Sequence, residues 1–568
     1  MEDNFSQKSK KIEEKMEKYF DNQTTSSSYI SEQNKEKLQI RKKKIFNKLF
    51  SKKKENNNMN MNNEPRSIDI NNLNCDEEIK KDPDVYIKTK FDIKNWFKYL
   101  FSKNKNDNYI ALLLINRYVI FQLFEIPEEK RKLSRNDTEL IQKLCDNLLS
   151  DDIKIIYNSC QILTNLSLFP KYIEQRIYSE RNLEKILKFF NVLTNNIPLL
   201  GYEPLYLFYN VAFNTDAKIY LIKNSFLDHF YNFLGNILNK ANNNINEIIE
   251  LNVIKNSMSI LYLLITICEI DDNYIKRFLP FIPICKLITS KYYVSIDNLL
   301  FDENETKNII FIWKYFSFNR LEKEKIVNEI INDNFIKVLI QLYYKIKDLK
   351  IRKQILELFS NFLDLGNDFD KILINDGIIK FFFDEIVRYQ YSNVEILNII
   401  IICCLDIASD NFGIPKLLYE SGIIYKIIEI TGFYIEDLLD KEIKSLLINS
   451  VNLLAHIIIF EEQEIKKNLL IYNKFSIINI FCITLKRDSF NQQDLAEKII
   501  YAFNDLNIVI ENYEESNPNL RIEYSDILLK NSLEELLNNY YEKKYLSDNI
   551  KEIIDEIKSS IKDFKKDI

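Results

Sequence analysis

The sequence predicts an all-α fold in which helical repeats stack one after another. Glycine and proline are scarce: 7 Gly and 10 Pro in 568 residues, or 3%, against about 12% in average usage. A β-rich fold or a glycine-rich phosphate loop needs more of these turn residues. From Phe91 to about residue 510, apolar residues recur at three- and four-residue spacing almost without a break, which is the pattern of amphipathic helices.

A short junction motif between two apolar helices supplies the third observation. It occurs at residues 223–227, 332–336, 375–379, 420–424 and 472–476. Its Gly or Asn is predicted to be the left-handed residue that ends a helix. Gly377 and Gly422 lie 45 positions apart. Periods of about 40–47 residues are typical of armadillo and HEAT arrays, and the two glycines favour armadillo. We therefore expect a right-handed armadillo-repeat superhelix (an α-solenoid), whose concave groove is lined by the third helix of each repeat.

The chain divides by composition into five parts. Residues 1–34 are polar and expected to be disordered. Residues 35–54 form a basic arm with ten Lys/Arg and one Glu, a net charge of +9, so the rest carries −6 − 9 = −15. Residues 55–85 are a low-complexity and acidic linker, 86–510 the repeat array, and 511–568 a terminal capping repeat and tail. An acidic body argues against nucleic acid as a partner and favours basic peptides.

Several function classes have no supporting motif. The eight cysteines show no C-x-x-C spacing and indicate buried thiols in a reducing compartment. The N-terminus has no apolar secretory segment, and the uncharged apolar stretch Asn256–Cys268 is too short to span a bilayer. His229 and His456 have no partners at metal-ligand spacing, and no catalytic motif is present. We expect no transmembrane segment, enzyme activity, metal or cofactor.

The third-helix positions carry a more specific pattern. Ser159-Cys160-Gln161-Ile162-Leu163-Thr164-Asn165 is followed by Tyr206-x-x-x-Asn210, Tyr262-x-x-x-Thr266 and Trp313-x-x-x-Ser317. This layout, after a basic arm and a linker, resembles importin α, the adaptor family that carries basic nuclear localisation signals into the nucleus. In that family the third helices carry a Trp-x-x-x-Asn ladder. Here Gln161 replaces the first Trp, and the later pairs Glu357/Asn361, Ile402/Asp406, Asn452/His456 and Ile500/Asn504 have no aromatic residue.

The resemblance implies roles for these residues. Asn amides would hold the backbone of an extended peptide, aromatic faces would receive Lys stems, and nearby carboxylates would receive the ammonium groups. The implied peptide-binding residues are Asn165, Tyr206, Asn210, Tyr262, Trp313 and Asn361, and the implied acidic groove is Asp216, Glu269, Asp271 and Asp272. The arm, with Arg41, Lys42, Lys43, Lys44, Lys52, Lys53 and Lys54, would bind importin β, or fold back into the groove when cargo is absent. The C-terminal repeats would meet an export factor, and the protein would occupy cytoplasm and nucleus.

Plainer alternatives stay open at each position. The tyrosines could be half-buried core residues, the asparagines ordinary helix-end residues, and Trp313 a core residue. The arm could be a solvated tail or the protein's own localisation signal, and its apolar set (Ile40, Ile45, Phe46, Leu49 and Phe50) suits an acidic membrane equally well. The alternative function is a cytoskeletal or membrane-associated armadillo scaffold that transports nothing. Contiguous negative charge beside the ladder is required for the adaptor but not for the scaffold.

Overall fold

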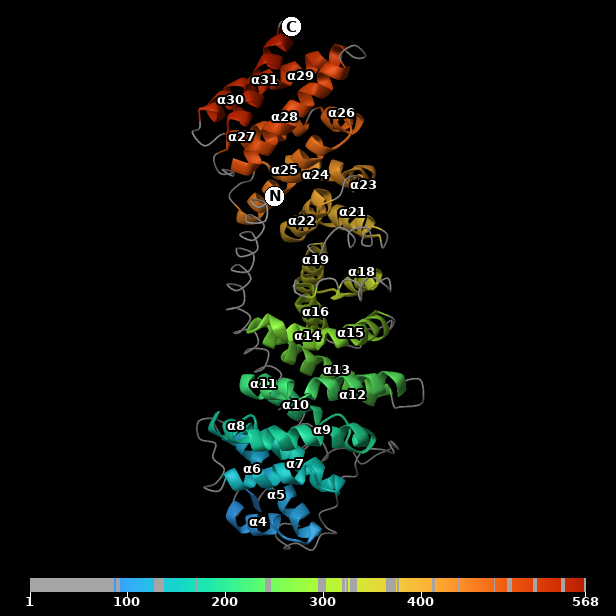
Figure 1. The fold of residues 1–568 in the computed structure, drawn as a ribbon, viewed down its shortest axis with the longest axis vertical. Helices are drawn as coiled ribbons and strands as arrows, with labels where there is room; N and C mark the ends of the chain where they lie inside the picture. Colours follow the sequence, from blue (N-terminus) through green and yellow to red (C-terminus); the bar gives the residue numbers. More distant parts are fainter. Residues whose placement is uncertain are drawn as a thin grey trace. The chain divides into compact units, whose positions relative to one another are not determined.

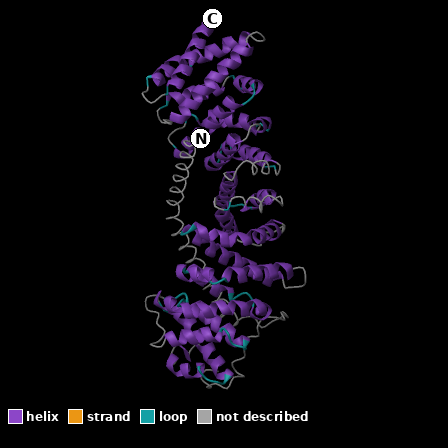
Figure 2. Cartoon of the chain, viewed as in Figure 1, coloured by secondary structure: helices purple, strands orange, loops and turns teal. Residues whose placement is uncertain are grey.

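The computed structural model describes most of the chain after residue 91 as helices joined by short turns (Figure 2). The part of the chain that the structure describes contains no β-strand. It comprises residues 86–87, 92–126, 137–169, 171–240, 247–294, 303–318, 322, 325–326, 335–363, 374, 377–410, 414–436, 440–474, 476–487, 493–513, 518–542 and 547–565.

The chain forms two compact units, residues 1–207 and 208–568, so the boundary falls within helix α10. In the first unit, α5 packs against both α4 and α7, while α6 packs against α7, α8 and α9. Its helices are α4 (Ile93–Leu100), α5 (Lys105–Glu125), α6 (Asp137–Asn147), α7 (Ile153–Leu166), α8 (Lys171–Ile177), α9 (Glu180–Leu200) and the first turn of α10 (Leu205–Phe213).

The second unit repeats a pattern of one or two shorter helices followed by a long third helix. After α10, the third helices are α13 (Glu247–Ile265), α16 (Glu303–Phe318), α19 (Leu349–Leu363), α22 (Val394–Asp410), α25 (Lys441–Phe460), α28 (Gln493–Tyr513) and α31 (Asp548–Lys565). The helices between them are α11 (Thr215–Lys223), α12 (Phe226–Lys240), α14 (Ile275–Phe278), α15 (Ile282–Ile288), α18 (Phe335–Lys345), α21 (Ile378–Tyr389), α23 (Ile414–Glu420), α24 (Ile423–Tyr434), α26 (Gln463–Ile471), α27 (Ser476–Lys486), α29 (Pro518–Lys530) and α30 (Leu533–Tyr541).

Each third helix of the second unit, from α13 onward, packs against the next one (Figure 1). The second helices α18, α21, α24, α27 and α30 form a parallel row of neighbours in the same order. Stacked aromatic rings fill the space between layers: the centroids of Phe208 and Phe226 lie 5.7 Å apart, and those of Phe226 and Phe230 5.5 Å apart. The core is therefore continuous from repeat to repeat, as expected for a solenoid.

The junction motif has the predicted left-handed residue at Gly377, Gly422 and Asn473. At residues 223–227 the prediction is wrong, because Asn224 has a φ of −103° and the following Ser225 is the left-handed residue. Gly377 and Gly422 have φ values of 90° and 84°, and α21 and α24 begin at the residue that follows each glycine. In other repeats Ser225 (φ 62°) and Ser532 (φ 54°) occupy the same place before a second helix. A left-handed residue ends one helix and lets the chain turn sharply. The short first helix therefore packs against the second helix that follows it, as α11 does against α12 and α23 against α24.

Two helices correct the expectation that no segment is long enough to cross a membrane. Glu250–Glu269 and Lys441–Phe460 are each 20 residues long, with mean hydropathy of 1.5 and 1.7, and by length and composition alone they could span one. In the structure these segments are third helices between neighbouring repeats, and 61% and 56% of their residues are buried. Burial on several sides explains their apolar composition, because a helix covered all round needs few polar residues.

The described cysteines agree with the expectation of buried thiols. All seven are buried, and none forms a disulfide within the described part of the chain: Cys145, Cys160, Cys268, Cys285, Cys403, Cys404 and Cys482. Burial raises the pKa of Cys145 and of Cys482 to about 12, so both stay protonated and unreactive at neutral pH. Cys75 lies outside the described residues.

Candidate functional site

Polar side chains of the third helices form hydrogen bonds with polar side chains of the neighbouring repeat. In the first unit, Asn116 on α5 donates to Gln161 Oε1 on α7 at 2.9 Å. Asn165 donates to Asn116 Oδ1 at 3.4 Å. Gln161 Nε2 donates to Tyr157 Oη at 2.7 Å and to Glu203 Oε2 at 3.1 Å. These five residues form one network across neighbouring helices.

This network explains why position 161 carries Gln rather than the Trp of the importin α ladder. A tryptophan at that position could not accept the Asn116 amide, whereas a glutamine both accepts and donates. The hydroxyl of Tyr157 also donates to Glu203, and burial together with this carboxylate raises the pKa of Tyr157. Asn165 is only 6% exposed. Its amide is therefore used within the protein rather than presented to a ligand.

In the second unit, lysines of the third helices pair with carboxylates of the following repeat. Lys255 Nζ lies 3.0 Å from Glu305, and Lys353 Nζ lies 2.9 Å from Glu395. Lys314, only 6% exposed, pairs with Glu357 at 2.5 Å. Each pair joins two consecutive third helices. We call these three ion pairs, together with the hydrogen bonds between ladder positions described next, the paired face.

The ladder positions of the second unit are bonded to neighbouring repeats as well. Asn361 donates to Ser317 Oγ at 3.2 Å, and Lys498 donates to Asn452 Oδ1 at 2.7 Å. His456 Nε2 lies 3.0 Å from the carbonyl oxygen of Ala408. The sequence pattern predicts these ladder positions but not their hydrogen-bond partners, which lie 44–48 residues away in the chain.

The predicted aromatic slots differ from one another. Tyr206 and Tyr262 are half-buried, and their rings contact Tyr202 at 6.4 Å and Phe311 at 5.7 Å between centroids. Trp313 is fully buried: its Nε1 donates to Thr289 Oγ1 at 3.2 Å, and its ring lies 4.3 Å from that of Phe335. A buried ring offers no face to a peptide, so Trp313 is a packing residue. Asn210 is half-buried on α10.

The four predicted groove carboxylates are all exposed and lie at one end of the third helices. Asp216 is in the first turn of α11, and Glu269, Asp271 and Asp272 follow α13 in two short 3₁₀ turns. Asp271 accepts from the backbone and the side chain of Asn273, both at 3.0 Å. Tyr315 on α16 donates its hydroxyl to Glu269. Within the described part of the chain, none of the four carboxylates forms an ion pair.

A buried lysine lies beneath these carboxylates. Lys218 on α11 is 7% exposed and donates to Thr266 Oγ1 at 2.6 Å. Burial lowers its pKa to about 8, and the charge of Glu269 acts in the opposite direction. The bond between Lys218 and Thr266 fixes α11 against the end of α13, so Asp216 and the Glu269–Asp272 segment belong to one local surface.

The charge along the third helices is mixed. Lysines 255, 314 and 353 each lie beside a carboxylate of the next repeat and neutralise it. The uninterrupted negative charge that a basic-peptide adaptor requires is therefore absent from this stretch of the second unit. Negative charge without a paired cation is instead found at the ends of α10 and α13. The arm residues 41–44 and 52–54 lie outside the described residues.

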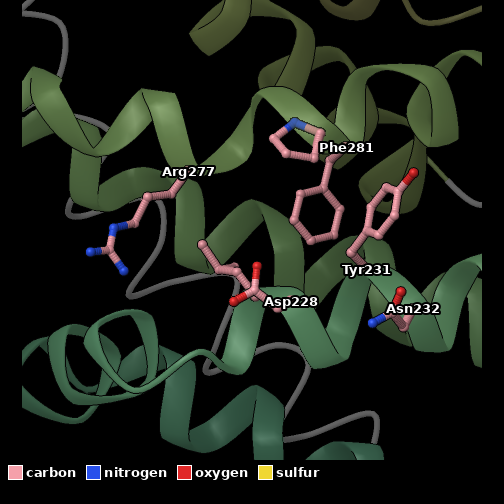
Figure 3. Close-up of a pocket in the computed structure, with 7 residues that line it drawn as sticks. Asp228, Tyr231, Asn232, Arg277 and Phe281 are labelled. Atoms are coloured by element: carbon pink, nitrogen blue, oxygen red, sulfur yellow. The ribbon is translucent and has the colours of Figure 1, made fainter.

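A small pocket on the second unit is the other candidate. It has a volume of 170 Å³ and is lined by residues of α12 and of the α14 region, with the rings of Tyr231 and Phe281 edge to face at 5.7 Å (Figure 3). Arg277 donates to the carbonyl oxygen of Ile222 at 2.8 Å and so closes the end of α11. No group of three or more potential metal ligands occurs among the described residues.

Neither a protein-family model nor a curated protein sequence matches the chain. Solved structures do. A structure described as a conserved phosphorylation switch controlling the interaction between cadherin and β-catenin matches 83% of this chain and 86% of its own, with 10% identity and a TM-score of 0.54. An engineered protein matches 83% of this chain and 99% of its own, with 13% identity and a TM-score of 0.52. Computationally designed armadillo repeat proteins for modular peptide recognition match 49% of this chain and 99% of their own at 12% identity, with a TM-score of 0.36.

The predicted fold class is confirmed: the described part of the chain is an all-α solenoid, and its fold is similar to those of the cadherin–β-catenin structure and of the engineered protein. At 10–13% identity these matches concern the fold, and function has to be argued from this chain's own residues.

Proposed function

We propose that this protein is a protein-interaction scaffold that binds a segment of a partner protein along its third-helix side. The observation that carries the proposal is the regular spacing of polar and aromatic groups on that side, repeated by the stacking of the helices. Cross-repeat bonds such as Lys353–Glu395 fix these groups before a partner arrives, and preorganisation reduces the entropy cost of binding. The solved structure that concerns the interaction between cadherin and β-catenin supports the same role for this fold.

The narrower form of the proposal is the nuclear-import adaptor suggested by the resemblance to importin α. Two observations support it: Tyr206 and Tyr262 are partly exposed, and Asp216, Glu269, Asp271 and Asp272 are exposed. The lysines of the paired face oppose it, because a run of Lys or Arg laid along them would be repelled. Importin β and an export factor as partners, and a cytoplasmic and nuclear location, are part of this narrower proposal only.

The general proposal is tested by selecting binders from a random peptide library displayed on phage, with the full-length chain as target. The scaffold role predicts enriched peptides whose affinity falls on Tyr262→Ala. Tyr541→Ala is the matched control, because Tyr541 is exposed at the end of the second helix α30 rather than on a third helix. If no peptide is enriched, or if the two substitutions weaken every peptide equally, the third-helix side is not a binding surface.

The narrower proposal is tested with a fluorescent peptide containing five consecutive Lys or Arg residues. Its control has the same composition but with the basic residues dispersed. An adaptor binds the first peptide at least about tenfold more tightly and loses this preference on Tyr206→Ala or Asn210→Ala. Equal binding of the two peptides would exclude the adaptor and leave the scaffold.

A further inference from the structure

At the C-terminal ends of α10 and α13, large apolar side chains are exposed next to the unpaired carboxylates. Ile270 is 66% exposed and Phe213, the last residue of α10, is 45% exposed. Asp216 lies three residues after Phe213, and Glu269, Asp271 and Asp272 surround Ile270 in the sequence. We call the residues Phe213, Asp216, Glu269, Ile270, Asp271 and Asp272 the open edge.

The open edge is one surface because its two segments are fixed together. α11, which follows Phe213 and contains Asp216, contacts the 3₁₀ turn that contains Glu269. Lys218 Nζ and Thr266 Oγ1 bond across this contact at 2.6 Å. On the other side, Tyr315 of α16 donates to Glu269, and Phe318 near the end of that helix is 45% exposed. The same edge therefore presents apolar groups from consecutive repeats.

The charge of the open edge defines the chemistry of its occupant. None of its four carboxylates forms an ion pair among the described residues, although the charge of Lys218 acts on Glu269. Other carboxylates of the third helices, such as Glu305 and Glu395, are paired. The helix dipoles of α10 and α13 add partial negative charge at their C-terminal ends. A cationic group placed here gains attraction from both sources. An apolar group beside it covers Ile270 and Phe213, and burying such side chains is favourable.

We propose that the open edge binds a partner-protein segment in which apolar side chains alternate with Lys or Arg. This rests on the proposed scaffold function and names both the surface and the class of partner. Apolar side chains of the segment pack on Ile270 and Phe213, and its cations lie between Asp216 and the Glu269–Asp272 carboxylates. The segment lies beside ladder positions such as Asn361 and Asn452, whose polar groups are already bonded to neighbouring repeats.

The test uses the full-length chain and a fluorescent 16-residue peptide of Leu and Lys with amphipathic spacing. Ile270→Ser is expected to weaken binding about tenfold through lost apolar contact. Asp271→Asn with Asp272→Asn is expected to weaken it about five- to tenfold and to reduce its dependence on salt. Asn keeps an oxygen that can cap the turn in place of Asp271, so this variant tests charge and not folding.

Matched controls lie on α29, where Ile522 is 41% exposed and Glu523 and Asp526 are exposed. Ile522→Ser, and Glu523→Gln with Asp526→Asn, are expected to leave the affinity unchanged. Two further peptides separate the contributions: Leu→Ser throughout keeps the charge, and Lys→Gln throughout keeps the apolar groups. Both are expected to bind at least about tenfold more weakly than the parent.

Three results would overturn the inference. The first is equal loss in the α29 controls and in the open-edge variants, or no loss in either. The second is binding of the chain to anionic vesicles, but not to the peptide, through the open edge. The third is a chain that binds peptide only after Arg41, Lys42, Lys43 and Lys44 are replaced by Ala, which would make the chain's own arm the occupant. If library peptides still depend on Tyr262 while the open-edge variants bind normally, the scaffold function stands and only this inference fails.

Discussion

The paired face and the open edge belong to the same stack of helices but use their charges in opposite ways. On the paired face, Lys314 and Glu357 from consecutive repeats neutralise each other at 2.5 Å. At the open edge, Asp271 and Asp272 are exposed and form no ion pair among the described residues. A charge paired inside the protein contributes to packing between repeats, whereas an unpaired exposed charge remains available to another molecule. The position of ion pairs therefore separates the surface that holds the solenoid together from the surface that can recognise a partner.

The largest expected effect concerns Trp313, which is at a ladder position yet fully buried. Trp313→Ala should destabilise the second unit by about 3–5 kcal/mol, because it removes a large side chain from a packed core. Chemical denaturation followed by circular dichroism measures this loss. A variant as stable as the wild-type chain would mean that the ring is not part of the core, and the peptide-slot role would then be the better explanation.

The second prediction tests the pairing itself. Lys314→Met should destabilise the chain by about 1–3 kcal/mol, because Glu357 is left partly buried without its cation. A double-mutant cycle with Glu357→Gln should give a coupling free energy of about 1 kcal/mol. The same cycle between Lys218 and Asp272, which form no ion pair, is the control and should give a smaller value. Equal coupling free energies in the two cycles would contradict the distinction between the paired face and the open edge.

The third prediction concerns Lys218, whose burial makes the free energy of unfolding depend on pH. Its folded pKa of about 8 lies below the ordinary value of 10.5, so between these values the unfolded chain binds more protons than the folded chain. Stability therefore rises with pH in this window, and the cost of burying the charged lysine is fully present below pH 8. Relative to Lys218→Met, the wild-type chain should gain about 1–2 kcal/mol between pH 7.5 and 9.5. A constant difference across this range would show that Lys218 is not desolvated.

The smallest effect is expected at the open edge. Asp271→Asn with Asp272→Asn should change the free energy of unfolding by less than about 0.5 kcal/mol, because exposed unpaired charges contribute little to stability. Thermal unfolding monitors this directly. A loss as large as that of Lys314→Met would indicate that these carboxylates serve the fold and would contradict the division between the two surfaces.

The sequence predicted the fold well because its signals are local. Gly377 and Gly422 are at junctions that require a left-handed backbone, a conformation that few residue types other than glycine adopt without strain. The structure confirms positive φ at both. The helical period locates the third helices and with them the ladder positions. The membrane-length helices were missed because charged residues inside them, such as Lys255 and Lys444, leave only shorter uncharged stretches.

The site could be predicted only in part, because its chemistry depends on how repeats align. Asn165 and Asn361 were found as ladder residues, but their partners Asn116 and Ser317 lie 49 and 44 residues away. No local pattern states which side chains will face each other across two stacked helices. The burial of Trp313 was equally hidden, since a tryptophan in a helix is compatible with a core or with a slot.

The central claim is that a partner meets the open edge and not the paired face. Hydrogen–deuterium exchange of the full-length chain with and without the Leu–Lys peptide tests it most directly. The account predicts slower exchange in the backbone amides of residues 213–216 and 269–272, and unchanged exchange in the middle of α19 and α22. Protection along α19 and α22 with none at residues 269–272 would contradict it, and would place recognition on the ladder after all.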